Sequence, residues 1–150
     1  MSSPSERFEC RWQGSRLLLT AYLGSQALTL SVLCLAALPA WARISLFLVC
    51  LAHAGWVIPR QVTLNHPRAV TGLRRDALGW WVCSRADGWY PVTLCRDSVA
   101  LPSLVVLRFV PKGRRLACSQ CIPRDALDAD AHRRLRLRLK FSRGRWSAAG

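Results

Sequence analysis

Acidic residues are scarce in this chain, which has eight Asp and Glu among its 150 residues against 22 Lys and Arg. The first 59 residues hold two of the acids and four of the bases, a net charge of +2. The remaining residues hold 18 bases and six acids, a net charge of +12. So large a positive charge implies an anionic partner, which could be lipid headgroups, nucleic acid or an acidic protein.

Signatures of catalysis are also lacking. The chain has no phosphate-binding loop and no GxGxxG fingerprint. Neither His66 nor His132 lies near a Ser or Cys motif that it could activate as a general base. We therefore expect a protein that is not an enzyme and that carries no cofactor.

The cysteines lack the pattern of a metal site or of a disulfide framework. A CxxC at residues 118–121 stands alone, whereas a structural zinc site needs four ligands. Cys83 and Cys95 would complete a set only if the strands that carry them met. The total of seven is odd, and Cys34 and Cys50 lie within apolar stretches. We expect no bound metal and reduced thiols, as in a domain that faces the cytosol.

Charge is absent from residues 17–38, a run of 22 residues. At 1.5 Å per residue a helix of this length reaches roughly 33 Å, enough for a hydrocarbon core of about 30 Å. The run has no polar stripe wide enough to face water, which excludes an amphipathic helix of a soluble protein. We predict a transmembrane helix over residues 17–38.

A second apolar run covers residues 44–58, and its 15 residues would by themselves also suit a buried core helix. Residues 39–42 can extend it, with Arg43 reaching toward the headgroups. Trp41 and Trp56 stand near its ends, where interfacial aromatic residues belong. We predict a second span over residues 41–58, so that residues 17–58 form a tight helical hairpin.

Arginines flank this hairpin on both sides but are rare in its loop. The positive-inside rule therefore places both termini in the cytoplasm. Residues 1–16 then form a cytoplasmic N-terminal segment, and residues 59–69 form a juxtamembrane linker. A competing interpretation is a signal peptide cleaved at residues 40–42, but its apolar region would be far too long. The flanking arginines are Arg7, Arg11, Arg16, Arg60, Arg68, Arg74 and Arg75, against Arg43 in the loop.

Gln26 and His53 are the polar candidates inside the predicted spans. An ionisable residue at this depth is by default a functional candidate. The alternative for His53 is a neutral imidazole bonded to a neighbouring backbone carbonyl. Gln26 is better explained by packing and hydrogen bonding between the two helices.

Residues 70–141 have the pattern of a basic, β-rich cytoplasmic domain, and residues 142–150 that of a flexible tail. Asp87-Gly88 suits a hairpin turn, because Asp-Gly tolerates positive φ. Pro91 lacks an N–H, which favours an edge position for its strand. We predict four or five antiparallel strands, including residues 79–83, 89–94, 104–110 and 115–122.

Residues 125–141 carry two competing patterns. Leu135, Leu137 and Leu139 alternate with basic residues at the period of a strand, yet a helical spacing also links four apolar residues. Acids at the start and bases at the end favour the helix, with Asp125 or Asp128 as the N-cap. The helical apolar stripe consists of Leu127, Ala131, Leu135 and Leu139. The start of a helix explains the three acids better than a metal site does; these acids are Asp125, Asp128 and Asp130.

This helix would place Arg133, Arg136 and Lys140 on one basic face, our candidate for binding a partner or an anionic surface. Basic and aromatic residues also interleave in the strand region. These side chains could stack on the bases of a single-stranded nucleic acid, or they could partition into a membrane interface. Because the domain is tethered to a membrane, we favour the second interpretation. These residues are Trp80, Trp81, Arg85, Trp89, Tyr90 and Arg96.

Together these features describe a membrane-anchored α+β protein: a two-helix transmembrane hairpin, then a small antiparallel β-rich cytoplasmic domain with a C-terminal helix. Over roughly residues 10–141 the chain resembles the YgfX (CptA) family of proteobacterial inner-membrane proteins. The most specific feature is the closing pattern D-x-[LM]-D-x-[DE]-x-x-R-x-L-R, which begins at Asp125. The other shared features are the two early spans, the Asp87-Gly88 hairpin, residues 94–98 and the strand at residues 104–109.

The resemblance implies an inner-membrane toxin of a toxin–antitoxin pair that inhibits cell division by binding the cytoskeletal proteins FtsZ and MreB. Family members are often encoded beside a small succinate dehydrogenase assembly factor. Three hypotheses remain open. The first is a membrane-anchored protein that binds cytoplasmic partners. The second is an assembly or accessory factor for succinate dehydrogenase maturation, and the third is a tethered nucleic-acid binder.

Overall fold

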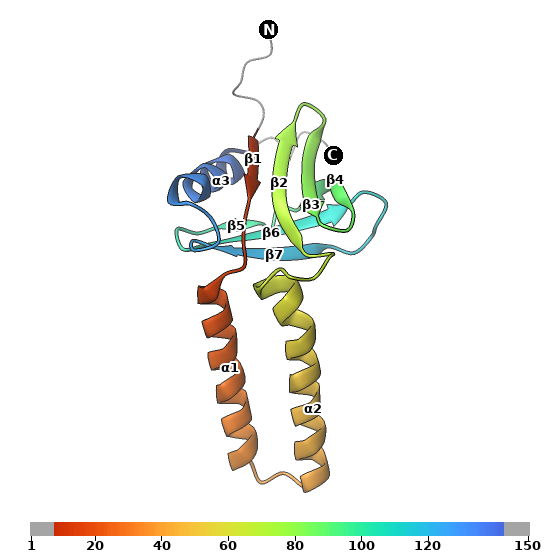
Figure 1. Ribbon diagram of the computed structural model, residues 1–150, viewed down its shortest axis with the longest axis vertical. Helices are drawn as coiled ribbons and strands as arrows, with labels where there is room; N and C mark the ends of the chain where they lie inside the picture. The colour runs from red at the N-terminus through yellow and green to blue at the C-terminus, as the bar shows by residue number, and fades with distance from the viewer. Residues whose placement is uncertain (1–7, 143–150) are drawn as a thin grey trace.

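Two long apolar helices form a hairpin that stands apart from a β-rich domain (Figure 1). The structure is a computed structural model, and it describes residues 8–142. Helix α1 (Arg16–Leu35) and helix α2 (Ala40–Val57) lie side by side, and neither contains a buried residue. Both are long and apolar enough to cross a membrane, each with a mean hydropathy of 1.6. The predicted hairpin is confirmed, and α1 ends three residues before the predicted limit.

A π-helical turn, η1 (Ile58–Val62), continues α2 toward the domain. Pro59 has no N–H to donate, and the Thr63 N–H bonds to the carbonyl of Ile58 at 2.8 Å, five residues back. The guanidinium of Arg60 lies 5.0 Å from the ring centroid of Trp56. This pair marks the domain-side end of the apolar segment, where aromatic and basic residues meet headgroups.

The domain is a curled sheet of seven antiparallel strands. Strands β1 to β4 stand upright in Figure 1, whereas β6 and β7 cross beneath them, next to the helices. Strand β6 is paired along both of its edges. Strands β4 and β5 pair with one edge, and β7 pairs with the other. The strands are β1 (Phe8–Arg11), β2 (Val70–Asp76), β3 (Gly79–Ser84), β4 (Gly88–Leu94), β5 (Val99–Ala100), β6 (Leu104–Pro111) and β7 (Cys118–Pro123).

Helix α3 (Ala129–Ser142) lies against the curl of the sheet. Its Leu135 and Leu139 are almost completely buried, as the helical stripe predicted. Leu127 and Ala131, the other members of the stripe, are half-buried. The alternating leucines at positions 135, 137 and 139 therefore belong to a helix and not to a strand. The sheet residues most deeply buried in the shared core are Leu73, Val82, Val105, Leu107, Phe109 and Ile122.

The Asp87-Gly88 turn lies where it was predicted, between β3 and β4. Gly88 has φ 65°, which a residue with a Cβ adopts only at a cost. The Ser84 hydroxyl accepts from the Asp87 N–H at 3.1 Å and closes the turn.

The edge position expected for Pro91 is wrong. Strand β4 pairs with β3 along its length and with β6 at Val92–Leu94. The Pro91 carbonyl accepts from the Lys112 N–H at 3.1 Å, so its nitrogen also points to the β6 side, beyond the paired residues. An interior strand thus holds this proline where its pairing with β6 ends, at the cost of the one bond that a Pro91 N–H would donate to Lys112.

Three element limits also differ from the predictions. Strand β1 takes Phe8–Arg11 into the sheet, pairing with residues 72–75 of β2, although residues 1–16 were expected to be a separate segment. Strand β7 begins at Cys118 rather than residue 115, after the turn at Gly113 (φ 87°). Helix α3 begins at Ala129 rather than residue 125. The predicted tail over residues 142–150 lies almost entirely outside the described residues.

Candidate functional site

The junction between hairpin and domain is built around the start of α1. The Ser15 hydroxyl accepts from the Leu18 N–H at 2.9 Å and donates to the Asp125 carboxylate at 2.6 Å. The other Asp125 oxygen accepts from the Leu17 N–H at 3.0 Å. A carboxylate at a helix N-terminus is favoured by the free N–H groups and the helix dipole.

Of the two residues predicted as the N-cap of α3, Asp125 does not cap its own helix. The helix begins directly after the other candidate, Asp128, whose carbonyl accepts from the His132 N–H at 2.8 Å. Burial alone would raise the pKa of Asp125, but its hydrogen bonds from Leu17 and Ser15 outweigh burial and lower that pKa. Asp125 therefore fastens the loop before α3 to the first apolar helix.

Backbone hydrogen bonds fix the chain between β1 and α1. The Trp12 N–H donates to the Thr71 carbonyl at 2.9 Å, and the Trp12 indole N–H donates to the Val70 carbonyl at 3.0 Å. The Ser15 N–H donates to the Val62 carbonyl at 3.1 Å, which joins the start of α1 to the end of η1. A Cβ on Gly14 would lie 2.8 Å from the carbonyl oxygen of Thr63, so only glycine fits this crossing.

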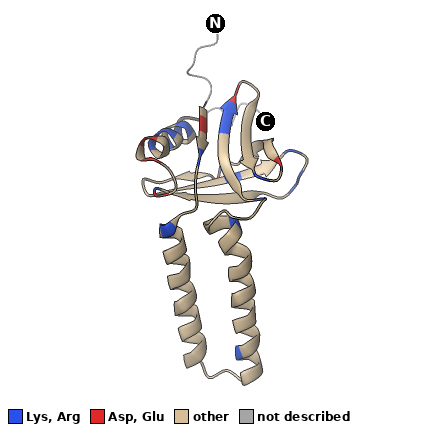
Figure 2. Ribbon diagram, in the orientation of Figure 1, with Lys and Arg blue, Asp and Glu red and all other residues tan. Residues whose placement is uncertain are grey.

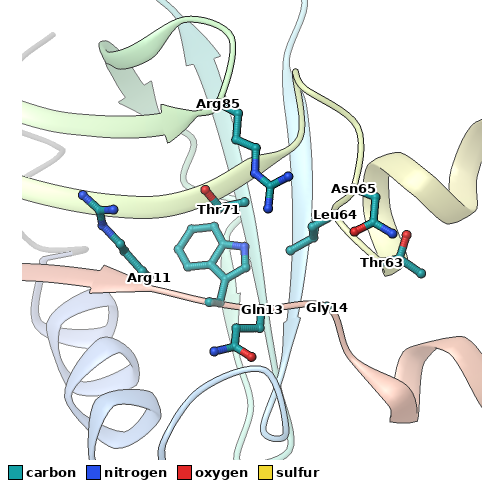
Figure 3. A pocket seen from close by; sticks show the side chains of 9 residues that line it. Arg11, Gln13, Gly14, Thr63, Leu64, Asn65, Thr71 and Arg85 are labelled. Atoms are coloured by element: carbon teal, nitrogen blue, oxygen red, sulfur yellow. The ribbon is translucent and has the colours of Figure 1, made fainter.

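A cleft of about 420 Å³ opens beside this crossing (Figure 3). The side chain of Arg85 extends from the β3–β4 turn toward Leu64 and the cleft. Leu64 itself is buried and has φ 56°, an unusual conformation for a leucine. The lining residues are Arg11, Trp12, Gln13, Gly14, Thr63, Leu64, Asn65, Thr71 and Arg85.

Gln26 and His53 belong to one polar network between the apolar helices. The Tyr22 hydroxyl lies 2.8 Å from His53 Nδ1, and the Gln26 amide donates to the same hydroxyl at 2.7 Å. The rings of Tyr22 and His53 are also stacked, with centroids 6.0 Å apart. His53 Nδ1 thus bonds to a side chain of the other helix. Tyr22 was not among the predicted site residues, although its spacing of four residues from Gln26 places both on one helix face.

The three basic candidates of α3 differ in their surroundings. Arg133 and Lys140 are exposed, whereas Arg136 is half-buried and donates to the Pro102 carbonyl at 3.2 Å. Arg138 lies 5.5 Å from the ring centroid of Phe8 on the other flank of the helix. Arg136 and Arg138, which border the buried stripe, therefore hold α3 against the domain, whereas Arg133 and Lys140 are open to solvent.

The interleaved aromatic and basic residues do not form one surface. Trp80 is buried in the core, whereas Trp81 and Trp89 lie on the outer face of the sheet. On that face the Arg74 guanidinium lies 4.9 Å from the centroid of Trp89 and 5.6 Å from that of Trp81. Because β2 and β3 stand upright above the hairpin in Figure 1, this outer face is directed sideways and not toward the helices.

A family model described as the membrane-bound toxin component of a toxin–antitoxin system matches residues 6–143. The chain belongs to this family. The match covers both apolar helices, every strand and α3, and it confirms the resemblance to the YgfX (CptA) proteins. No curated protein and no solved structure matches the chain. This protein is thus a membrane-bound toxin component, and the junction lies within the matched region.

The cysteines of this toxin component form no disulfide. All seven cysteines are free, and burial raises the pKa of the Cys10 thiol to about 12. Within residues 8–142 no three His, Cys, Asp or Glu side chains are grouped so as to hold a metal ion. His132 is buried, and burial, together with the charge of Arg136, lowers its pKa against the opposing effect of a hydrogen bond with the Ile122 backbone.

Proposed function

We propose that this toxin acts by binding a cytoplasmic protein, not by catalysis, from a multi-pass position in the inner membrane with both termini in the cytoplasm. By family resemblance the targets are the cytoskeletal proteins FtsZ and MreB. The net charge of +12 after residue 59 supports an acidic partner. The arginines gathered at the domain end of the hairpin, against Arg43 alone near its other end, support the proposed orientation (Figure 2).

The exposed face of α3 carries this proposal. Leu137 and Phe141 expose 43% and 73% of their surface, although they lie on a helix whose opposite side is fully buried. Arg133 and Lys140 flank them at helical spacing. Apolar side chains rimmed by charge are typical of protein-binding surfaces, so this face suits a partner that offers an apolar patch with acidic residues around it.

A double variant, Arg133→Ala with Lys140→Ala, tests this face. Arg136 is left in place, since its bond to Pro102 helps to hold the helix. The matched control is Arg96→Ala with Arg115→Ala, two exposed arginines that make no side-chain hydrogen bond or ion pair within residues 8–142. We expect both variants to accumulate in membranes, and only the α3 variant to lose partner capture and toxicity.

Crosslinked membranes from cells that produce the full chain supply the readout. FtsZ or MreB should copurify with the wild type and with the control, less so as salt rises. Equal capture by the α3 variant at every ionic strength would show that the face is only solvated surface. Recovery of succinate dehydrogenase instead of filament proteins would favour the assembly-factor hypothesis, and binding to bare oligonucleotide with a steep salt dependence would favour the nucleic-acid hypothesis.

A further inference from the structure

The cleft at the junction lies at the depth of phospholipid headgroups. The Trp56–Arg60 stack marks the domain-side end of the apolar segment, and Thr63 follows Arg60 by three residues, about 5 Å along a helix. On the other helix, Gly14 precedes the first residue of α1 by two positions. The headgroup layer of a bilayer is roughly 5–8 Å thick on each side. Both walls of the cleft therefore enter this layer.

The lining has the chemistry of a phosphate site. It combines the guanidinium of Arg85 with the polar side chains of Gln13, Asn65 and Thr71, whereas the Thr63 hydroxyl already donates to the Ile58 carbonyl at 3.2 Å. Arginine recognises phosphate by paired, charge-assisted hydrogen bonds, and neutral amides and hydroxyls can complete the set of donors. The indole of Trp12 and the side chain of Leu64 provide an apolar wall, which suits the glycerol end of a lipid headgroup (Figure 3).

Arg85 is available for a ligand. It is exposed, points into the cleft, and makes no hydrogen bond or ion pair with any residue between 8 and 142. The second lining arginine is already engaged, because Arg11 pairs with Glu9 at 3.3 Å and stacks over Trp89. Arg85 is thus the cation of this cleft that lacks a partner.

Within residues 8–142 no carboxylate forms an ion pair with Arg85. Asp125 is bonded to Ser15 and Leu17, and it does not line the cleft. Asp87, two residues from Arg85, accepts from the Ser84 hydroxyl at 3.3 Å in the β3–β4 turn. The cleft consequently offers one open positive charge and several neutral donors to an incoming anion.

We propose that this cleft binds the phosphate of one anionic phospholipid, such as phosphatidylglycerol, from the domain-side leaflet. The acyl chains of this lipid would lie along the apolar helices while the headgroup enters between the ends of α1 and η1. A lipid held there would contact β1, the β3–β4 turn and both helix ends. Its binding would stabilise the domain against the membrane.

Native mass spectrometry of the full chain in an uncharged detergent tests this site. Phosphatidylglycerol, phosphatidylcholine or inorganic phosphate is added to wild type and to two variants, Arg85→Gln and Asn65→Asp. We expect one tightly retained phosphatidylglycerol on the wild type and much weaker retention of phosphatidylcholine. Each variant should weaken phosphatidylglycerol binding at least tenfold, roughly 1.4 kcal/mol, by removing the cation or by adding a negative charge.

Arg115→Gln is the matched control, because it removes an equally exposed arginine from the β6–β7 loop. It should retain phosphatidylglycerol like the wild type. Wild-type affinity in both cleft variants would overturn the proposal. Displacement of the lipid by an equal concentration of inorganic phosphate would overturn the lipid as the source and assign the cleft to free phosphate. An equal loss in Arg115→Gln would show that lipid binds through overall charge and not in the cleft.

Discussion

The Asp125 carboxylate lies 2.6 Å from the Ser15 hydroxyl, although 110 residues separate the two in the sequence. Through this contact the loop before the last helix holds the first turn of the first helix. The same carboxylate also accepts from the Leu17 N–H at 3.0 Å. The apolar hairpin and the toxin domain therefore behave as coupled parts, because only three residues separate Asp125 from the first residue of α3.

Replacing Asp125 by Ala should lower the free energy of unfolding by about 1–2 kcal/mol, because the first turn of α1 loses its acceptor. Thermal unfolding in detergent micelles measures the effect. Asp97→Ala is the control, since it removes an exposed ion pair with Arg108 that should contribute under about 1 kcal/mol. Equal losses in the two variants would contradict a special role for Asp125.

The contribution of Asp125 should depend on pH. Its folded-state pKa lies below the ordinary value of about 3.9, so the stabilisation is fully present above that value and is lost as the pH falls through the folded-state pKa. The melting temperatures of wild type and Asp125→Asn should differ by a constant amount near neutral pH. That difference should shrink below about pH 4. A gap that persists unchanged in acid would show that the ionised carboxylate is not the stabilising species.

Two leucines of α3 offer a matched test of its orientation. Leu135 is completely buried, so Leu135→Ala should cost about 2–5 kcal/mol in unfolding free energy. Leu137 exposes 43% of its surface, and Leu137→Ala should change stability by under about 0.5 kcal/mol. Chemical denaturation of both variants provides the comparison. A larger loss for Leu137→Ala would mean that the helix is rotated.

The polar network between the apolar helices should make a modest contribution. Tyr22→Phe removes the hydroxyl shared by Gln26 and His53, and hydrogen bonds between membrane helices average about 0.6 kcal/mol. Unfolding in bicelles should therefore show a loss of roughly 0.5–2 kcal/mol. Ser31→Ala is the control, because the Ser31 hydroxyl bonds only to the Ala27 carbonyl of its own helix. Equal stability of the two variants would mean that the network does not hold the helices together.

Both chain termini should be cytoplasmic. A reporter that is active only in the periplasm should stay silent when fused after Gly150, whereas one fused in the loop between α1 and α2 should be active. The expected asymmetry follows from the arginines at the domain end of the hairpin, compared with Arg43 alone near its opposite end, in the first turn of α2. An active reporter after Gly150 would invert the topology.

Features set by local pattern could be predicted from the sequence. The uncharged runs located both apolar helices, the Asp87-Gly88 pair located a hairpin, and the spacing of Leu135 and Leu139 located the buried side of α3. Each depends on neighbours within a few residues, where helix period, turn chemistry and hydropathy act directly. The closing Asp-rich pattern, taken together with the two early spans, the Asp87-Gly88 hairpin and the strand at residues 104–109, likewise identified the family.

The tertiary structure alone determined the junction. Residues 8–11 became a strand because β2 offered an unpaired edge more than 60 residues away, and Asp125 became a cap because the fold brought it to the free N–H groups of α1. The partner of His53 was decided in the same way, by the register of two helices. In each case the group that satisfies a hydrogen bond is remote in the chain. A local pattern shows that a donor or acceptor exists, and only the packed fold selects its partner.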